Sequence, residues 1–394
     1  MSDAPLSGIL SLNCEDPLQF EQEQYWTDMT IPPLKDTEKP ALFRRYPVLE
    51  EHLPWISLTK TPTPVERLAT LEQELDVGGL WIKRDDMCGC GYGGNKPRKL
   101  EFLLAEAKVK GAKSLITLGG LGSHHTLATV ACANRLGFQS SLILAKRPLS
   151  EKGKQNLLAS HAMGASLSYA SNDVFAGWMI ALVYMRLWRR DGVRPYFVAP
   201  GGTSALGCLG YVSAAFELAE QIQRGECPEP DAIFVAMGSM GTAAGLWLGL
   251  RLAGLSTQLV PVRVYQDFRT NPFGLKWYAM ASQRLLSRHI PNFEKVSLPT
   301  SEIDIIKGFI GPGYGHITTA AREAASRLSA TEHIDLEYVY TGKCFAGLLE
   351  DVEQGRWSGK QIMYWHTYNS YPLQALSPTK LSLVKPPKGF EKFF

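Results

Sequence analysis

Short apolar runs alternate with longer amphipathic segments along most of the chain. From about residue 53, stretches typical of buried strands are separated by stretches in which apolar residues recur at helical spacing. The predicted strands are 80–83, 114–118, 140–144, 166–169, 196–199, 232–236, 259–265 and 361–366. This alternation predicts an α/β fold with parallel sheets that are covered by helices.

Residues 1–50 differ from the rest of the chain. They are rich in Pro, Glu and Asp and show no clear periodicity. We expect an N-terminal extension that wraps the surface, with Trp26 and Phe43 as its anchors.

Composition restricts the classes of function. With 394 residues and 45% apolar content, the chain can bury a large core and should form two domains. A net charge of +3 from scattered basic residues does not indicate a nucleic-acid partner. The first five residues lack a basic region followed by an apolar run, so no export signal is expected.

Cysteine usage also indicates a protein that is not exported. Seven cysteines show no Cys-x-x-Cys or Cys-x-x-His spacing, and the adjacent His124 and His125 diverge on a helix. We therefore expect a reduced, cytoplasmic protein without a metal site.

The stretch 232–250 is uncharged and long enough to raise the question of a membrane span. Its four glycines, two hydroxyl residues and strand–turn–helix pattern favour buried α/β core instead. No membrane partner is expected.

The segment 93–102 carries the most specific chemistry. It has two glycines, a possible capping residue in Asn95, and three cations, Lys96, Arg98 and Lys99, before an amphipathic segment. A lysine held by a tight turn at a helix start can be aimed and partly desolvated. A lysine that attacks an aldehyde needs such partial desolvation, because its amine must first lose a proton. An ordinary basic helix start is the alternative, and these ten residues do not decide between the two.

Two strand–glycine loop–helix units follow. Strand 114–118 leads through 119–126 into a predicted helix over about 127–136, and strand 231–237 leads through 238–242 into a helix from residue 243. Such loops present backbone N–H groups to an anion. The pair suggests one loop for a phosphate and one for a carboxylate.

With these motifs, the chain resembles the pyridoxal-phosphate (PLP) enzymes of fold type II, which are tryptophan synthase β-like, and within them the branch of D-cysteine desulfhydrases and 1-aminocyclopropane-1-carboxylate (ACC) deaminases. The matching stretches run in family order between about residues 62 and 366: 93–100, 119–126, 200–207, 238–242, 311–315 and 339–343.

The resemblance implies PLP as cofactor, a small amino acid as substrate and a homodimer. It also implies two parallel-sheet α/β domains with the cofactor between them. After the extension 1–50, the large PLP-binding domain would comprise 51–104 and 213–394, and the small inserted domain 105–212. Periodicity alone does not show that division.

The resemblance also assigns roles to residues. Lys96, after Asn95, matches the lysine that carries the cofactor and then acts as general base. Lys99, about one helical turn on, is either part of this chemistry or a solvated cation. The phosphate loop matches Gly238, Ser239, Met240, Gly241 and Thr242, and the substrate-carboxylate loop matches Ser123, His124 and His125, with Ser123 also catalytic.

Several positions depart from the family pattern. His124 stands where relatives carry an Asn that contacts the cofactor's phenolic oxygen, and Leu127 replaces a usual arginine. Met240 replaces a small residue. Tyr368 and Asn369 replace two glycines. The resemblance therefore leaves the substrate open.

The tyrosines and threonines bear on the reaction type. Tyr314 and Tyr340 match two active-site tyrosines that shuttle protons or orient the substrate amine. Thr341 matches the partner of the pyridine nitrogen, a glutamate in ACC deaminases and a small hydroxyl residue in desulfhydrases. A carboxylate would keep that nitrogen protonated, which opening of a cyclopropane without an α-hydrogen requires. Thr367, a substrate-binding candidate, also matches the desulfhydrases.

These positions predict a PLP lyase that performs α,β-elimination, with D-cysteine as the family-implied substrate. Three alternatives stay open: ACC deamination, a β-replacement synthase, and a PLP-binding protein with little catalysis. Only His124 and Tyr368 support the last.

Overall fold

The computed structural model describes residues 38–89, 92–266, 270–370 and 384–394. Its strands are β1 (Val65–Arg67), β2 (Gly79–Lys83), β3 (Ser114–Gly120), β4 (Gln139–Ala145), β5 (Ser166–Ala170), β6 (Tyr196–Val198), β7 (Ala232–Met237), β8 (Gln258–Arg263) and β9 (Gln361–Trp365). Its α-helices are α2 (Ala41–Arg45), α3 (Leu49–His52), α4 (Ala69–Glu72), α5 (Asn95–Val109), α6 (His124–Asn134), α7 (Glu151–Ala162), α8 (Asp173–Asp191), α9 (Ala205–Gln223), α10 (Gly241–Leu252), α11 (Pro272–Ser287), α12 (Thr319–Glu332) and α13 (Thr341–Glu353).

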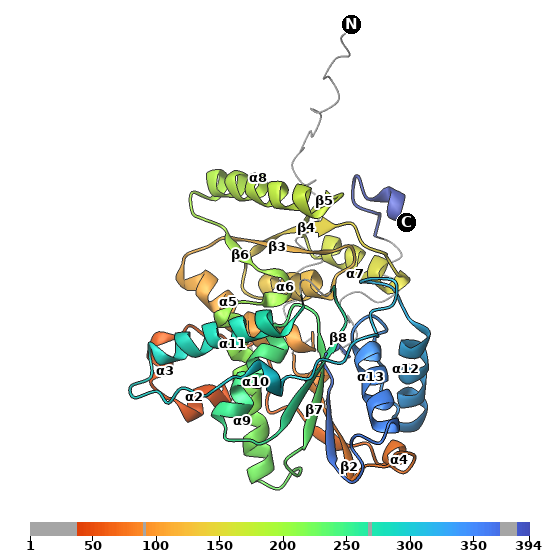
Figure 1. Ribbon diagram of the computed structural model, residues 1–394. Helices are drawn as coiled ribbons and strands as arrows, with labels where there is room; N and C mark the ends of the chain where they lie inside the picture. Colours follow the sequence, from red (N-terminus) through yellow and green to blue (C-terminus); the bar gives the residue numbers. More distant parts are fainter. Residues whose placement is uncertain (1–37, 90–91, 267–269, 371–383) are drawn as a thin grey trace, which may run out of the picture. The chain divides into compact units, whose positions relative to one another are not determined.

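The larger sheet has the order β1-β2-β9-β7-β8, and all of its pairs are parallel except β1 with β2. Helices cover both faces (Figure 1). Alternate residues of β7 separate into two cores: Ile233 and Val235 pack with α9, α10 and α11, whereas Phe234 packs with α12 and α13. A strand that is buried on both faces needs apolar residues at every position, which explains the continuous apolar run.

The smaller sheet has the order β5-β4-β3-β6 and is entirely parallel. Helix α8 contacts β3, β4 and β5, while α6 contacts β3 and β4. The two sheets are distinct in Figure 1. The predicted domain limits at 104/105 and 212/213 fall inside α5 and α9, and the division into two domains stays a prediction.

All eight predicted strands are present, each within about two residues of its expected ends, and the α/β fold class is confirmed. The antiparallel edge strand β1, of only three residues with mixed exposure, was not among the predicted strands. Edge strands that are short and polar carry little periodic signal.

Part of the expected N-terminal extension forms short helices that the sequence did not indicate. Residues 41–52 contain α2 and α3, and α2 packs on α9 with Leu42 and Phe43 buried. Phe43 is thus an anchor, as expected, while Trp26 lies outside the described residues. Helices of one turn are too short to show a 3.6-residue period, and tertiary packing stabilises them.

No helix among the described residues has both the length and the apolarity to cross a membrane. The uncharged stretch 232–250 forms β7, a glycine loop and most of α10, as its strand–turn–helix pattern predicts.

Candidate active site

A cavity of about 520 Å³ lies where the parallel strands of both sheets end. Residues at or within two positions of the ends of β3, β4, β6, β7 and β9 contribute to its wall. This is the edge at which open α/β sheets bind ligands. Every sequence-predicted site residue lines it except one: Lys96, Asn95, Ser123, His124, His125, Gly238, Ser239, Met240, Thr242, Tyr314, Tyr340, Thr341 and Thr367 do, and Gly241 does not.

The turn before Lys96 depends on Gly94. Its φ is +81°, and a Cβ there would lie 2.7 Å from the carbonyl oxygens of Thr367 and Tyr368. Only glycine fits such a turn without displacing the chain. Gly94 is also the N-cap of α5, so the expectation that Asn95 caps the helix was wrong: Asn95 is the first helical residue.

The side chain of Asn95 connects the lysine to the second glycine loop. Its Oδ1 accepts a hydrogen bond from Lys96 Nζ, and its Nδ2 donates to Thr242 Oγ1 at 2.9 Å. Burial, together with the nearby charge of Lys99, lowers the pKa of Lys96 to about 7. An amine with that pKa is largely a free base just above neutral pH, which makes it a competent nucleophile and proton acceptor.

Lys99 is not a solvated cation, which corrects one of the two sequence interpretations. Its side chain is fully buried, and Nζ donates to the carbonyl oxygen of Gly201 at 3.1 Å. Burial lowers its pKa to about 8. Lys99 is absent from the cavity wall and holds α5 against the Pro200–Gly202 turn.

The loop between β7 and α10 contains Met240 in the left-handed region, with φ +68°. That conformation is uncommon for a long side chain. The sulfur and methyl of Met240 lie against Gly274, where a Cβ would come within 3.0 Å of the methyl. The structure thus accommodates Met240 by directing it towards the start of α11.

Hydroxyl groups flank this loop. Ser239 Oγ accepts a hydrogen bond from Thr203 Oγ1 at 2.8 Å, and Thr242 lies in the first turn of α10. Gly241 faces Thr203 instead of the cavity, with its Cβ position 2.7 Å from Thr203 Oγ1. Its contribution to an anion site is therefore limited to its backbone at the helix N-terminus.

In the loop between β3 and α6, Ser123 is the N-cap of α6 and accepts a hydrogen bond from the His125 N–H at 3.2 Å. The ring of His125 is turned into the small sheet. Its Nε2 lies 2.8 Å from Thr117 Oγ1, which itself donates to the Val198 carbonyl, so Nε2 is the donor. The His125 ring anchors the loop through this contact.

His124 faces the cavity between two aromatic residues. Its ring meets Tyr368 edge-on at 5.5 Å between centroids, and Tyr92 Oη donates to its carbonyl oxygen at 3.0 Å. Burial lowers the pKa of His124 to about 3, with the charge of Lys96 adding to the effect. The imidazole is therefore neutral at physiological pH and acts as a hydrogen-bonding group without charge.

Tyr314 and Tyr340 also line the cavity. Their hydroxyls hydrogen-bond to each other, and Tyr265 packs edge-on against Tyr314 at 4.5 Å between centroids. Burial raises the pKa of Tyr314 to about 12 and also raises the pKa of Tyr340 well above its usual value. Both phenols are protonated at neutral pH and can donate a proton.

Thr341 begins α13, and its hydroxyl is bound to the turn before it. Oγ1 accepts from the Glu337 N–H at 2.8 Å and donates to the Glu337 carbonyl at 3.0 Å. The carboxylate of Glu337 also lines the cavity and accepts from the N–H groups of Val339 and Tyr340. Burial raises the pKa of Glu337. Sequence reasoning missed Glu337, although a carboxylate just before the Tyr340–Lys343 motif was visible.

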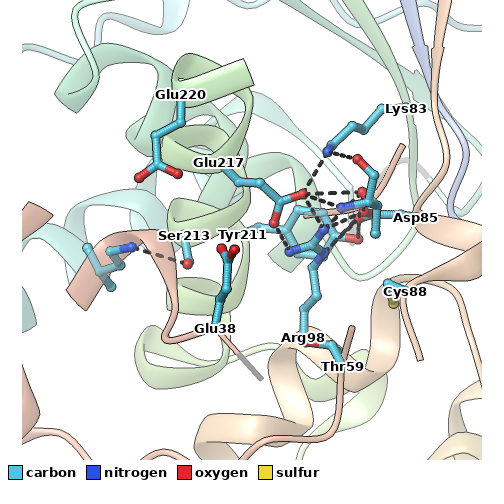
Figure 2. Close-up of polar contacts among 12 residues, drawn as sticks. Glu38, Thr59, Lys83, Asp85, Cys88, Arg98, Tyr211, Ser213, Glu217 and Glu220 are labelled. Atoms are coloured by element: carbon cyan, nitrogen blue, oxygen red, sulfur yellow. Dashed lines mark hydrogen bonds and ion pairs between the residues drawn. The ribbon is translucent and has the colours of Figure 1, made fainter. Parts of the chain in front are cut away.

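A buried ion cluster fixes the base of the lysine helix (Figure 2). Arg98 binds Asp85 at 2.7 Å and Glu217 at 2.8 Å, and Lys83 binds Glu217 at 2.6 Å. Asp85 also accepts from Tyr211 Oη at 2.7 Å. Two cations and two anions from β2, the 3-10 turn after it, α5 and α9 are thereby joined two residues from Lys96.

This arrangement defines a class of protein. A lysine of lowered pKa faces a cavity at the carboxyl ends of parallel strands, between two glycine loops that each begin a helix. The class is an α/β enzyme that holds an aldehyde cofactor with an anionic group.

The comparison with known proteins identifies the family. The family model described as pyridoxal-phosphate dependent enzyme matches residues 56–367, and the chain belongs to this family. Its fold is that of the fold type II PLP enzymes.

Two curated relatives and one solved structure illustrate the range within the family. A putative ACC deaminase from Pyrococcus horikoshii is 34% identical over 328 residues, which cover 83% of this chain and 93% of the relative. A D-cysteine desulfhydrase from Salmonella newport is 33% identical over 333 residues, 82% and 97% of the two chains. The crystal structure of an ACC deaminase homologue matches with a TM-score of 0.72 and 32% identity, over 85% and 96% of the two chains.

The residues of the cavity fit PLP. Lys96 has the lowered pKa that attack on an aldehyde needs. The left-handed conformation of Met240 directs the β7–α10 loop towards the N-terminus of α10, where backbone N–H groups can bind a phosphate. We propose that Lys96 binds the aldehyde carbon, that the loop Gly238–Thr242 binds the phosphate, and that His124 and Thr341 contact the ring.

Replacing Thr242 with Val should weaken PLP binding by about one to two orders of magnitude. Thr242 Oγ1 accepts from Asn95, so its own hydrogen can be donated to a phosphate oxygen. Such a charge-assisted bond contributes about 1.5–3 kcal/mol. The measurement is the dissociation constant of PLP by fluorescence titration of apoprotein. Thr129→Val, at a buried helical threonine away from the cavity, is the control. An unchanged constant for Thr242→Val would place the phosphate elsewhere.

Proposed function

We propose that this protein is a PLP-dependent lyase that removes an α-proton from a small amino acid and expels its β-substituent. D-Cysteine is the proposed substrate; with one water it yields pyruvate, hydrogen sulfide and ammonia. The observation that carries the proposal is the hydroxyl of Thr341 at the start of α13, where an ACC deaminase would need a carboxylate.

The hydrogen bonds of Thr341 support this choice. Its one hydroxyl hydrogen is engaged with the Glu337 carbonyl, and the group carries no charge. It can therefore stabilise a protonated pyridine nitrogen only weakly. The Glu337 carboxylate accepts the N–H groups of its own turn. Elimination of a good leaving group after α-proton loss needs a weaker electron sink than cyclopropane opening.

Bound PLP would supply the electron sink, and the chain would supply binding and proton transfer. Lys96 Nζ would accept the α-proton, because its pKa of about 7 lets it act as a base near neutral pH. The Ser123 loop would receive the substrate carboxylate at the N-terminus of α6. The protonated Tyr314–Tyr340 pair could donate a proton to the leaving group or orient the amine.

Changing Thr341 to Glu should shift the reaction towards ACC. The unaltered protein should release sulfide from D-cysteine far faster than it opens ACC, and the variant should lower that ratio of rates about tenfold or more. The measurements are sulfide release and 2-oxo acid formation on both substrates. Thr367→Ser, which keeps a hydroxyl in the same cavity, is the control. Faster ACC turnover by the unaltered protein would contradict the proposal.

Two further expectations belong to the proposal. The family resemblance favours a homodimer, which the mass in solution would test, and a cytoplasmic location, which cell fractionation would test.

A further inference from the structure

One charged residue of the cavity wall has no role in the chemistry proposed above. Arg147 follows β4 and lines the same cavity as Lys96. Among the described residues of that wall, Lys96 and Arg147 are the two basic side chains other than the histidines. Lys96 would hold the cofactor and serve as the base, with a pKa of about 7, which leaves Arg147 as the permanent cation.

The neighbours of Arg147 determine how its side chain lies at the edge of the cavity. A Cβ on Gly120, the last residue of β3, would lie 2.9 Å from Arg147 Cγ and 3.8 Å from the ring of Tyr314. Because Gly120 has no side chain, the stem of Arg147 can lie against the end of β3, beside the tyrosine pair. Pro148, the residue after Arg147, packs near Gly315, the residue after Tyr314. This contact holds the two loops together.

The guanidinium interacts with Tyr265 and also has an anionic partner that an incoming anion could join or replace. One Nη donates to the Lys146 carbonyl at 2.7 Å and the other to Asp173 Oδ1 at 3.1 Å. Asp173 also lines the cavity, and its side chain is 44% exposed while that of Arg147 is 21% exposed. An ion pair with that exposure holds its partners weakly. A guanidinium carries five N–H donors and can bind a second oxyanion beside its first.

We infer that Arg147 binds a second negative charge on the substrate, so that the site takes, in addition to D-cysteine, amino acids whose β-substituent carries an anionic group and binds these more tightly. The inference rests on the proposed lyase function. The substrate's α-carboxylate would occupy the Ser123 loop, and the anion at the far end of its side chain would reach Arg147 beside Tyr314. A carboxylate, sulfonate or phosphate on the leaving group has the required chemistry.

The test uses ligands without an amino group, so that their binding is measured apart from turnover. Succinate and glutarate carry two carboxylates, and their half-amides succinamate and glutaramate have the same shape with one charge fewer. Calorimetry on the holoenzyme at pH 7.5 should show at least one diacid binding about tenfold more tightly than its half-amide, the effect of one charge-assisted contact.

Variants of Arg147 and of Asp173 should affect the preference for the diacid differently. Arg147→Gln should abolish the preference for the diacid, and Asp173→Asn should preserve or increase it, because it removes a competing carboxylate. Arg251→Gln is the matched control, since Arg251 pairs with Glu302 at similar exposure, 25% and 40%, outside the cavity wall. It should retain the full preference.

Three results would overturn the inference: no detectable binding of either diacid, equal binding of diacid and half-amide, or an equal loss of both ligands in Arg147→Gln. The last would assign Arg147 to the α-carboxylate. Turnover of β-chloro-D-alanine, whose side chain is uncharged, tests the lyase function separately. Its absence together with a retained diacid preference would reject the lyase and keep the anion site.

Discussion

Replacing Lys96 with Met should abolish both the visible absorption band of bound PLP and all turnover. Lys96 is the one lysine of the described cavity wall, and its amine is linked through Asn95 to Thr242 of the opposite loop. Methionine retains most of the side-chain volume, so loss of the band would report the loss of the amine. The measurements are the absorption spectrum of purified protein and 2-oxo acid release.

Lys99→Met is the matched control. Lys99 lies three residues further on the same helix and is also buried, but it does not line the cavity, and its amine contacts the Gly201 carbonyl. The band should persist in this variant. A band that persists in Lys96→Met and disappears in Lys99→Met would reverse the assignment of the cofactor lysine.

The pKa of Lys96 adds a dependence on pH. Only the unprotonated amine attacks an aldehyde, and a pKa of about 7 makes the unprotonated fraction rise through pH 7. The rate at which apoprotein takes up PLP covalently should therefore increase from pH 6 to 8 and then level off. A rate that still increases tenfold per unit above pH 9 would indicate a lysine with an ordinary pKa.

Most of the fold could be predicted because its strands are buried on both faces. β7 is an uninterrupted apolar run that is buried at every position, and the first four residues of β3 are also buried. The helices of residues 41–52 could not be predicted. α2 owes its stability to packing against α9, which follows it by more than 150 residues, and long-range contacts leave no local period.

The candidate site was predictable to the extent that its residues belong to motifs. Thirteen predicted residues line one cavity, because each motif is a loop at the end of a strand. Arg147 and Glu337 were missed, since a single charged residue in a loop is usually solvated and only the fold brings it to the cavity. Lys99 was ambiguous for a related reason: a cation within a helical pattern does not reveal whether its face meets solvent or the Gly201 turn.

The ion cluster behind Lys96 was not expected from the sequence at all. Its members come from β2, the turn after it, α5 and α9, and all are buried. Burial of charges is costly unless each is paired, and here each cation has an anion within 2.8 Å. The cluster therefore also restricts where α5 can begin, and with it the direction of Lys96.

Replacing Glu217 with Gln should lower the free energy of unfolding by about 3–5 kcal/mol, the usual cost of leaving buried charges without their partner. Glu217 is bound by both Lys83 and Arg98. Glu220→Gln is the matched control on the same helix: it breaks a half-exposed pair with Arg44, and such pairs contribute at most about 1 kcal/mol. Figure 2 shows both glutamates. Denaturant unfolding of the holoenzymes gives the comparison.

The pH dependence of the difference in unfolding free energy between the unaltered protein and Glu217→Gln tests whether lost charge causes it. Burial opposes ionisation of Glu217, but the charges of Arg98 and Lys83 prevail and hold its pKa well below the usual range. A carboxyl whose pKa is depressed in the folded state contributes its stability above the unfolded pKa, and loses it as the pH falls towards the folded pKa. The gap between the unaltered protein and Glu217→Gln should therefore be full at pH 7 and shrink below about pH 4.5. A gap that is constant from pH 7 to 4 would mean that lost packing, not lost charge, destabilises the variant. If the gap shrinks and the visible band of the variant is also weakened at pH 7, the ion cluster sets the position of Lys96 as well as the stability of the fold.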